Sequence, residues 1–329
     1  MPKPYESLST RAQVARLKPV GMRFCDLFGI KGARLRLLNH GFNTTFGVES
    51  SSGERFALRI NVNSFRGRAE IGAELAWVGA LARDTDLNVP IPRAGLGEIE
   101  SEEFCKTVFG ALYSWLPGPT GDSVPSPVVA RAVGEATVKL HDHARSWTVP
   151  EGCQFNPVRN VTFGADLRFA EHGFAGDLSV MEEVQSRGNE ALERLRTAPP
   201  TPIHYDLHLS NVKWHRGKLS VFDFDDAILG YPAMDVAVSL FYLRRYPQGV
   251  EMEAAYREGL GKPVQEFGFS EEDCETLIAA RGLGLANELY AMNTAELIEL
   301  APRYAALTEV RLRHFLKTGR FDPSVATLS

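Results

Sequence analysis

Residues 202–235 read PIHYDLHLSNVKWHRGKLSVFDFDDAILGYPAMD and hold the densest group of reactive side chains in the chain. Their polar residues form two clusters, one containing Asp206 and Asn211 and the other beginning at Asp223. Between the clusters, apolar residues alternate around a turn at 216–218, which predicts a short β-hairpin. Such a hairpin would bring Asp206, Asn211 and Asp223 to one mouth.

Carboxylates that converge in this way indicate a bound cation. Buried like charges raise one another's pKa and destabilise a fold unless a cation lies among them, and a divalent metal ion is the simplest choice. The spacing also meets the needs of phosphoryl transfer. Asp206 would accept the proton of an attacking hydroxyl, while Asn211 and Asp223 would hold Mg²⁺ on the phosphates of a nucleotide.

The composition is that of a folded protein with well-buried cores. The chain has 329 residues, of which 44% are hydrophobic, enough for one large domain or two ordinary ones. A net charge of -5 disfavours a dedicated nucleic-acid binder. The four cysteines lie far apart and form no CxxC pair, which favours a reducing compartment. Because no signal or membrane-spanning segment is visible, we expect a cytoplasmic protein that does not bind membranes.

The pattern of residues changes at a Pro/Gly-rich break near residue 117. Before it, residues 7–29 predict two short helices separated at Pro19 and Gly21, and residues 34–60 predict three antiparallel strands. Further predicted helices, one before the break and five after it, cover 66–83, 127–145, 166–196, 232–244, 250–259 and 270–318. We therefore expect an α+β fold, with an antiparallel-sheet lobe over 1–112, a hinge at 113–118 and a mainly helical lobe over 119–329.

Three short segments carry a resemblance to a known family. They are His204-Tyr205-Asp206 with Asn211, Phe222-Asp223-Phe224-Asp225, and Asp235-Val236-Ala237. They resemble the HGDxxxxN, I-D-[FW] and D-[LV]-A segments of the aminoglycoside phosphotransferase/choline kinase-like superfamily, relatives of eukaryotic protein kinases. The resemblance implies a protein-kinase-like fold of two lobes and an ATP-dependent kinase with Mg²⁺ as cofactor, and it leaves GTP open as the donor.

The resemblance also implies a set of nucleotide-binding residues in the first lobe. They are Gly41, Asn43 and Thr44 in the loop over the phosphates, Arg59 with its helix partner Glu74, and Tyr113 and Trp115 in the adenine-docking hinge. The chain departs from the family in two places. Arg59 stands where protein kinases have lysine, although many members of the superfamily have arginine there, and Tyr205 stands where the family usually has glycine.

Other interpretations of the same residues stay open. His204, Asp206 and His208, with His215 and Asp223, could form the Zn²⁺ or Mn²⁺ site of a metallohydrolase, and a catalytically inactive binding module is a third class. Arg59 and Glu74 could be a surface pair, and Tyr113 and Trp115 core residues. One of Asp225 and Asp226 could help to hold a metal ion, or they could serve in a turn or a salt bridge. His204 is expected to support the loop through hydrogen bonds, and Asp235 to cap a helix and bond to the loop.

The acceptor is expected to be a small molecule with a hydroxyl group. The family places its site beside the C-terminal helices, where the acidic and aromatic residues are Glu288, Tyr290, Glu296, Glu299 and Tyr304. Such residues would suit a cationic amino alcohol, amino acid or aminoglycoside, or they could simply form solvated helix faces. We favour a metabolic kinase, with an aminoglycoside phosphotransferase or a Ser/Thr protein kinase as alternatives. The oligomeric state cannot be inferred from the sequence.

Overall fold

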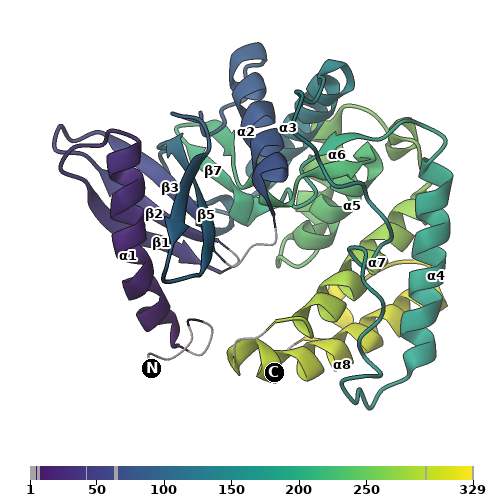
Figure 1. Ribbon diagram of the computed structural model, residues 1–329. Coiled ribbons are helices and arrows are strands. Elements are labelled where there is room, and N and C mark those ends of the chain that lie inside the picture. The colour runs from purple at the N-terminus through teal and green to yellow at the C-terminus, as the bar shows by residue number, and fades with distance from the viewer. Residues whose placement is uncertain (1–4, 6–7, 42, 63–65, 293–294, 328–329) are drawn as a thin grey trace. The chain divides into compact units, whose positions relative to one another are not determined.

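The protein divides into two compact units (Figure 1). The computed structural model describes residues 5, 8–41, 43–62, 66–292 and 295–327. The first unit comprises 1–117 and 148–155, and the second comprises 118–147 and 156–329. The division after Pro117 therefore falls inside the segment expected to be the hinge.

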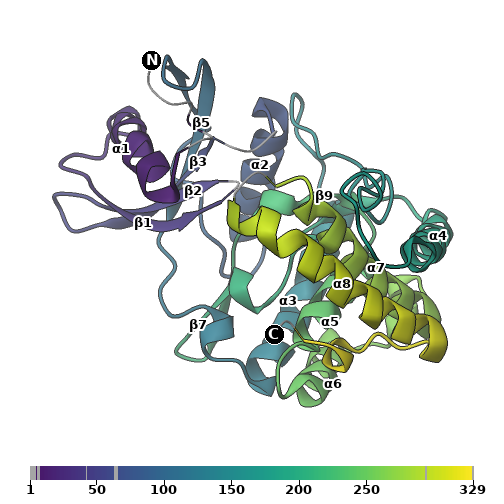
Figure 2. The ribbon, with the colours of Figure 1, turned by 90° about the horizontal axis from the view of Figure 1, so that it is seen from below.

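A five-stranded antiparallel sheet in the order β1-β2-β3-β5-β4 forms the first unit. Its strands are β1 (Arg34–His40), β2 (Thr44–Glu49), β3 (Arg55–Asn61), β4 (Gly97–Ser101) and β5 (Lys106–Ser114). Two helices belong to this unit, α1 (Thr10–Leu27) and α2 (Arg68–Asp84). Helix α1 lies alongside the sheet in both views (Figures 1 and 2).

Alternation along β3 decides which residues face each helix. Successive side chains of a strand point to opposite faces of a sheet. Leu58 and Ile60 accordingly lie in one apolar core with residues of α1, whereas Ala57 packs in another with residues of α2. Arg59 shares the face of Ala57, so its guanidinium group reaches Glu74 on α2.

The structure corrects the prediction of two helices over residues 7–29, because α1 runs continuously through Pro19. A proline inside a helix removes one backbone hydrogen bond. Leu17 and Phe24, on either side of Pro19, are fully buried in the core, and this burial outweighs the loss. Phe24 packs so closely on β5 that a Cβ atom at Gly110 would lie 2.6 Å from its ring, which explains the glycine there.

Residues 148–155 belong to the first unit, although the sequence placed them in the helical lobe. The backbone amide of Gln154 donates to the carbonyl of Ala69, and its side chain donates to Glu70 at 2.8 Å. Phe155 meets Trp77 edge to face. The segment follows a helix of the second unit and has no composition that marks a return to the first, so the prediction missed it.

The second unit is mainly helical. Its helices are α3 (Pro127–Ser146), α4 (Leu178–Leu195), α5 (Pro232–Leu243), α6 (Gly249–Leu260), α7 (Glu271–Leu289) and α8 (Ala295–Thr318). Helix α8 packs against α7 (Figure 2). The helix expected over 166–196 begins only at Leu178, where the Asp177 side chain caps its first turn by accepting from the Ser179 amide, and residues 166–177 form turns and irregular backbone. An antiparallel sheet followed by helices agrees with the α+β fold expected from the sequence.

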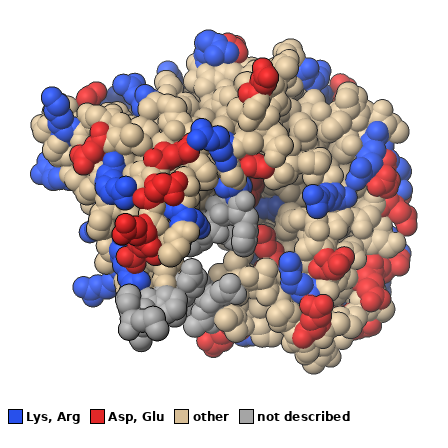
Figure 3. Space-filling view, viewed as in Figure 1, with Lys and Arg blue, Asp and Glu red and all other residues tan. Residues whose placement is uncertain are grey.

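The surface carries charges of both signs. On the face in Figure 3, Lys and Arg side chains are interspersed with Asp and Glu side chains. Among the described residues, no helix combines the length and the apolar character that a membrane span requires.

Candidate active site

Two pairs of short antiparallel strands hold the polar segment of the second unit in place. The pairs are β6 (Thr201–Ile203) with β9 (Ile228–Gly230), and β7 (Val212–His215) with β8 (Lys218–Val221). The strands enclose two loops, residues 204–211 and 222–227. The loops are neighbours, because the Phe222 amide donates to the Asn211 carbonyl at 3.0 Å. The hairpin expected around 216–218 is present, with Arg216 and Gly217 at positive φ in its turn.

Asp206 lies at the centre of the first loop, with both carboxylate oxygens engaged. Oδ1 accepts a hydrogen bond from Arg281 at 2.6 Å, and Oδ2 accepts one from the Asn211 amide nitrogen at 2.9 Å. His208 Nδ1 accepts from the Ser210 backbone amide, so the proton of the neutral ring lies on Nε2, 3.2 Å from Oδ2. Burial alone would raise the pKa of Asp206, but the His208 hydrogen bond and the Arg281 charge lower it below its ordinary value. The carboxylate is therefore ionised and able to accept a proton.

Asp235 on α5 fixes the backbone of this loop. Its Oδ1 accepts from the Tyr205 amide at 2.6 Å, and its Oδ2 accepts from the His204 amide at 3.1 Å. His204 Nε2 lies 3.1 Å from the Phe222 carbonyl in the neighbouring loop, in agreement with the expected supporting role. The bond from Asp235 to the loop was expected from the sequence and is present, whereas the expected cap of the helix is not. Helix α5 begins at Pro232, a residue favoured at a first helical position, so Asp235 falls inside the first turn.

Two residues of the site adopt a left-handed backbone conformation that side chains rarely tolerate. Tyr205 has a φ of 63° and Asp223 a φ of 64°. The first value explains why glycine is usual at the position of Tyr205. Such strain persists only where the surrounding structure compensates for it, and it is concentrated at functional sites.

The second loop concentrates negative charge beside Asp206. Burial, followed by the charges of Asp206 and Asp225, raises the pKa of Asp226 to about 8. The accessible surface of Asp226 is nevertheless large, so water reaches it, and we attribute the direction of the shift mainly to repulsion between carboxylates.

These residues fit a divalent cation. Asn211 donates through its amide nitrogen to the Asp206 backbone carbonyl and carboxylate, which leaves the amide oxygen for a metal ion. The Asp223 side chain is exposed to solvent. Magnesium suits such a pair, because it prefers oxygen ligands and keeps several of its waters.

The histidines do not support a zinc centre. The His204 and His208 rings are engaged with the backbone and with Asp206. Within the part of the chain that the structure describes, no group of three His, Cys, Asp or Glu side chains is arranged to hold a metal ion. A metallohydrolase therefore finds no support in the described residues.

The first unit contains a separate buried charge network around Glu74. The carboxylate of Glu74 accepts from Arg59 at 2.6 Å, from Arg66 at 2.8 Å and from the Tyr113 hydroxyl at 3.0 Å. Burial would raise the pKa of Glu74, but the two arginine charges lower it to about 2. Glu74 and Arg59 are 1% and 6% exposed, so they do not form the surface pair that was one alternative.

The residues expected in the loop over the phosphates differ in their surroundings. Asn43 accepts from the Asn61 amide at 2.7 Å, and its backbone carbonyl accepts from the Gly41 amide. Thr44 is buried, with its hydroxyl 2.7 Å from His40, and so packs inside the unit. Phe42, in the same loop, lies outside the described residues.

The two aromatic residues of the expected hinge differ in their surroundings. Tyr113 is buried and bound to Glu74, so its side chain belongs to the charge network. Trp115 is half-buried, with the Arg55 guanidinium 3.8 Å above its ring.

Two arginines of these networks were missed from the sequence. Arg66 joins Glu74 just before α2 begins, and Arg281 reaches Asp206 from 75 positions away on α7. A signal for Arg281 did exist. It is the only charged residue in the run LIAARGLGLAN, and a charge inside an apolar helix is seldom buried without a partner.

A kinase-like class follows from this combination of fold and loops, and the family comparison agrees with it. Residues 34–272 match the phosphotransferase enzyme family, and the chain belongs to that family. The resemblance, the fold class and the phosphotransferase class predicted from the sequence are thereby confirmed.

A curated relative resembles a short part of the chain. The amicoumacin kinase of Bacillus subtilis (strain 168) is 32% identical over 75 residues, which are 21% of this chain and 21% of that protein. The chain thus matches about a fifth of the length of this curated relative.

Two solved structures are similar over nearly the whole chain. A microcompartment-associated aminopropanol kinase has a TM-score of 0.70 and 20% identity, covering 92% of this chain and 99% of that one. An amicoumacin kinase in complex with AMP-PNP, Ca²⁺ and Ami has a TM-score of 0.70 and 16% identity, covering 97% and 100%. At these identities the likeness shows the fold.

Proposed function

We propose that this protein transfers the γ-phosphate of ATP to a hydroxyl group of a small molecule that carries an amine. The carrying observation is the position of Asp206, an ionised carboxylate beside Asn211 and in the loop next to Asp223. This is the set of groups that phosphoryl transfer needs for its base and its metal ion.

Each residue has a definite part in the proposed reaction. Asp206 orients the acceptor hydroxyl and takes up its proton as the oxygen attacks phosphorus. Asn211 and Asp223 hold Mg²⁺, which supplies positive charge to the phosphate oxygens when it is bound. In the first unit, Glu74 keeps the Arg59 guanidinium in place to contact phosphate.

The preference for an amine rests on the surplus of carboxylates in the second unit. Burial and the charge of Asp206 raise the pKa of Glu288 on α7, and Asp226 is raised in the same direction. A cationic acceptor would relieve this repulsion. The similar solved structures include an aminopropanol kinase, which supports an amino alcohol, and an aminoglycoside phosphotransferase, which supports the second candidate.

The other residues that the sequence suggested for the acceptor site give weaker support to a cationic acceptor. Tyr290 stacks on His172 with ring centroids 4.8 Å apart, Tyr304 is buried, and Glu299 is exposed. The side chain of Glu296 lies outside the described part of the structure.

The test is a coupled ADP-release assay with amino alcohols, aminoglycosides and a protein substrate as acceptors. We expect turnover with an amino alcohol, and Asp206→Asn should reduce kcat by about 10²–10⁴-fold while the variant stays folded. Asp223→Asn should abolish the rise in melting temperature that Mg²⁺-ATP produces by binding the folded state. Asp273→Asn, at a carboxylate on α7 paired with the exposed Arg194, is the matched control and should change neither result.

Two outcomes would contradict the proposal. One is full turnover by Asp206→Asn, and the other is a wild-type melting temperature that Mg²⁺-ATP leaves unchanged. Transfer to aminoglycosides alone, or to protein alone, would replace the amino alcohol with one of the alternatives.

A further inference from the structure

Arg281 contacts the proposed base from outside the catalytic loop. It lies on α7, is 7% exposed, and donates from Nη2 to Asp206 Oδ1 at 2.6 Å. An arginine so deeply buried is costly unless its contacts are well made. Its role therefore needs an explanation beyond that of a surface ion pair.

Three aromatic rings fix the position of the guanidinium group. Its central carbon lies 5.2 Å from the ring centre of Phe163, 5.6 Å from that of Tyr205 and 5.7 Å from that of Tyr242. Nη2 also lies 3.4 Å from the Tyr242 hydroxyl. The rings come from three separate segments, and each attracts the cation through its face. Arg281 is thus held as a rigid donor.

Arg281 holds the carboxylate oxygen of Asp206 that the neighbouring loop residues leave without a contact. The loop residues His208 and Asn211 both contact Oδ2, and Arg281 contacts Oδ1. Contacts on both oxygens fix the rotation of the carboxylate. A carboxylate has about four lone-pair positions, so one position on Oδ1 remains for an acceptor hydroxyl.

One buried donor of Arg281 is left without an acceptor. Its Nε is buried and has no hydrogen-bond partner, and the side chain borders a small cavity with Phe163 and Tyr205. An unpaired buried donor costs free energy. The side chain is therefore placed for its contact with Asp206 and not for complete hydrogen bonding.

We propose that Arg281 is a positioning residue, which holds the Asp206 carboxylate in the orientation that receives the acceptor proton. This inference rests on the proposed function, because it assigns Arg281 an effect on that reaction. A small misplacement of a reacting group can reduce a rate by about 10²-fold.

The experiment compares Arg281→Met and Arg281→Lys with a matched buried arginine. Arg281→Met should lower kcat by about 10²-fold and leave KM for ATP within about twofold. Arg281→Lys should recover part of kcat, since an ammonium group can still donate to Oδ1. The control is Arg311→Met on α8, because Arg311 is also 7% exposed and donates from Nε and Nη2 to the Ala326 carbonyl. It should lose stability but keep kcat well below its melting temperature.

A double variant tests whether Arg281 acts through Asp206. In Asp206→Asn/Arg281→Met, the second change should cost almost nothing further, because the group being positioned is already lost. Multiplicative losses, or equal kcat in Arg281→Met and Arg311→Met, would overturn the proposal.

A crystal structure of Arg281→Met tests the role of Arg281 even if the proposed function is wrong. If the wild type transfers phosphate to no acceptor, the proposed function fails, yet the orientation of Asp206 can still be observed. A rotated or disordered carboxylate supports the inference, and an unchanged one overturns it.

Discussion

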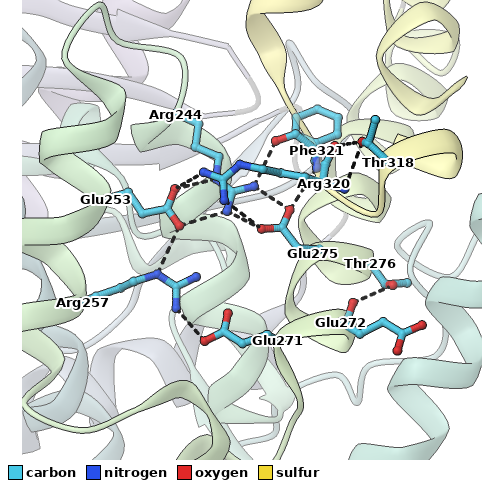
Figure 4. Close-up of polar contacts among 10 residues, drawn as sticks. All are labelled: Arg244, Glu253, Arg257, Glu271, Glu272, Glu275, Thr276, Thr318, Arg320 and Phe321. Atoms are coloured by element: carbon cyan, nitrogen blue, oxygen red, sulfur yellow. Dashed lines mark hydrogen bonds and ion pairs between the residues drawn. The ribbon is translucent and has the colours of Figure 1, made fainter. Parts of the chain in front are cut away.

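Arg244 and Arg281 are two buried arginines of the second unit with very different surroundings. Arg244 donates from Nε and Nη2 to Glu253 at 2.8 and 3.0 Å, and from Nη1 and Nη2 to Glu275 at 2.7 and 2.6 Å (Figure 4). Its Nη1 also reaches the Phe321 carbonyl at 3.0 Å. Every nitrogen of Arg244 is bonded, whereas the Nε of Arg281 has no partner.

The two places also differ in how completely their carboxylates are paired with positive charge. Beside Arg244, burial would raise the pKa of Glu253, but hydrogen bonds from Arg244 lower it. In the site of Arg281, the pKa of its partner Asp206 is lowered as well, but burial and the charge of Asp206 raise the pKa of the neighbouring Asp226. Complete pairing of charge thus accompanies a structural role, and incomplete pairing accompanies reactive groups, where strain and unmet charge are tolerated.

The largest effect on stability is expected from removing Arg244 from its cluster with Glu253 and Glu275. Arg244→Met leaves Glu253 and Glu275 buried without their main partner, so we expect a loss of about 3–5 kcal/mol in the free energy of unfolding. Urea denaturation monitored by circular dichroism measures it. The kcat of the folded fraction should stay unchanged, because the cluster holds no reacting group. A loss below about 1 kcal/mol would remove the contrast between the two arginines.

A smaller effect, which stabilises the protein, is expected from a substitution at Asp226. Asp226→Asn should raise the melting temperature in the presence of a chelator, because it removes a repelled carboxylate. The raised folded pKa gives the sign: below pH 3.8 both states are protonated and the substitution changes little. Between pH 3.8 and about 8 the Asp226 carboxyl ionises first in the unfolded state, so the contribution of this group to the stability of the wild type falls as pH rises. The advantage of the variant should grow over this range and then level off.

Thermal unfolding of both proteins from pH 4 to pH 9 checks this second prediction. Asp142→Asn, on the exposed surface of α3, is the control and should show no such growth with pH. A constant or shrinking difference would mean that Asp226 is not repelled by its neighbours.

The smallest effect is expected where an ion pair is exposed. Arg131 and Glu258 lie 2.5 Å apart, but their side chains are 48% and 59% exposed. Solvent screens such pairs, so Arg131→Ala should change the free energy of unfolding by less than about 0.5 kcal/mol. Urea denaturation at low and high salt measures the difference. A loss as large as that of Arg244→Met would show that burial does not decide the strength of these contacts.

Local patterns made much of the fold and of the polar loop over residues 204–211 predictable. The turn at Arg216 and Gly217 fixed the hairpin, and its two strands placed Asn211 next to Phe222. The pair of Arg59 with Glu74, in contrast, was expected from the family resemblance, and it is present.

Features that depend on tertiary packing were not predictable in the same way. Pro19 was taken as a break, but the burial of α1 overrides the cost of a proline. Asp235 was taken as a cap, because the start of α5 at Pro232 was not recognised. The contact between Arg281 and Asp206 joins residues 75 positions apart, a distance over which residue spacing carries no information.

The Arg244 cluster has a further consequence, for the kinetics of folding. Arg244 donates to the carbonyl of Phe321, 77 positions away in the sequence. The backbone amide of Phe321 donates to Glu275 at 2.9 Å, across 46 positions. Contacts between such distant positions require large loops to close, so they form after the local helices. Interactions absent from the folding transition state slow unfolding without speeding folding. The hydrogen bonds around Phe321 should therefore determine mainly how long each molecule remains folded.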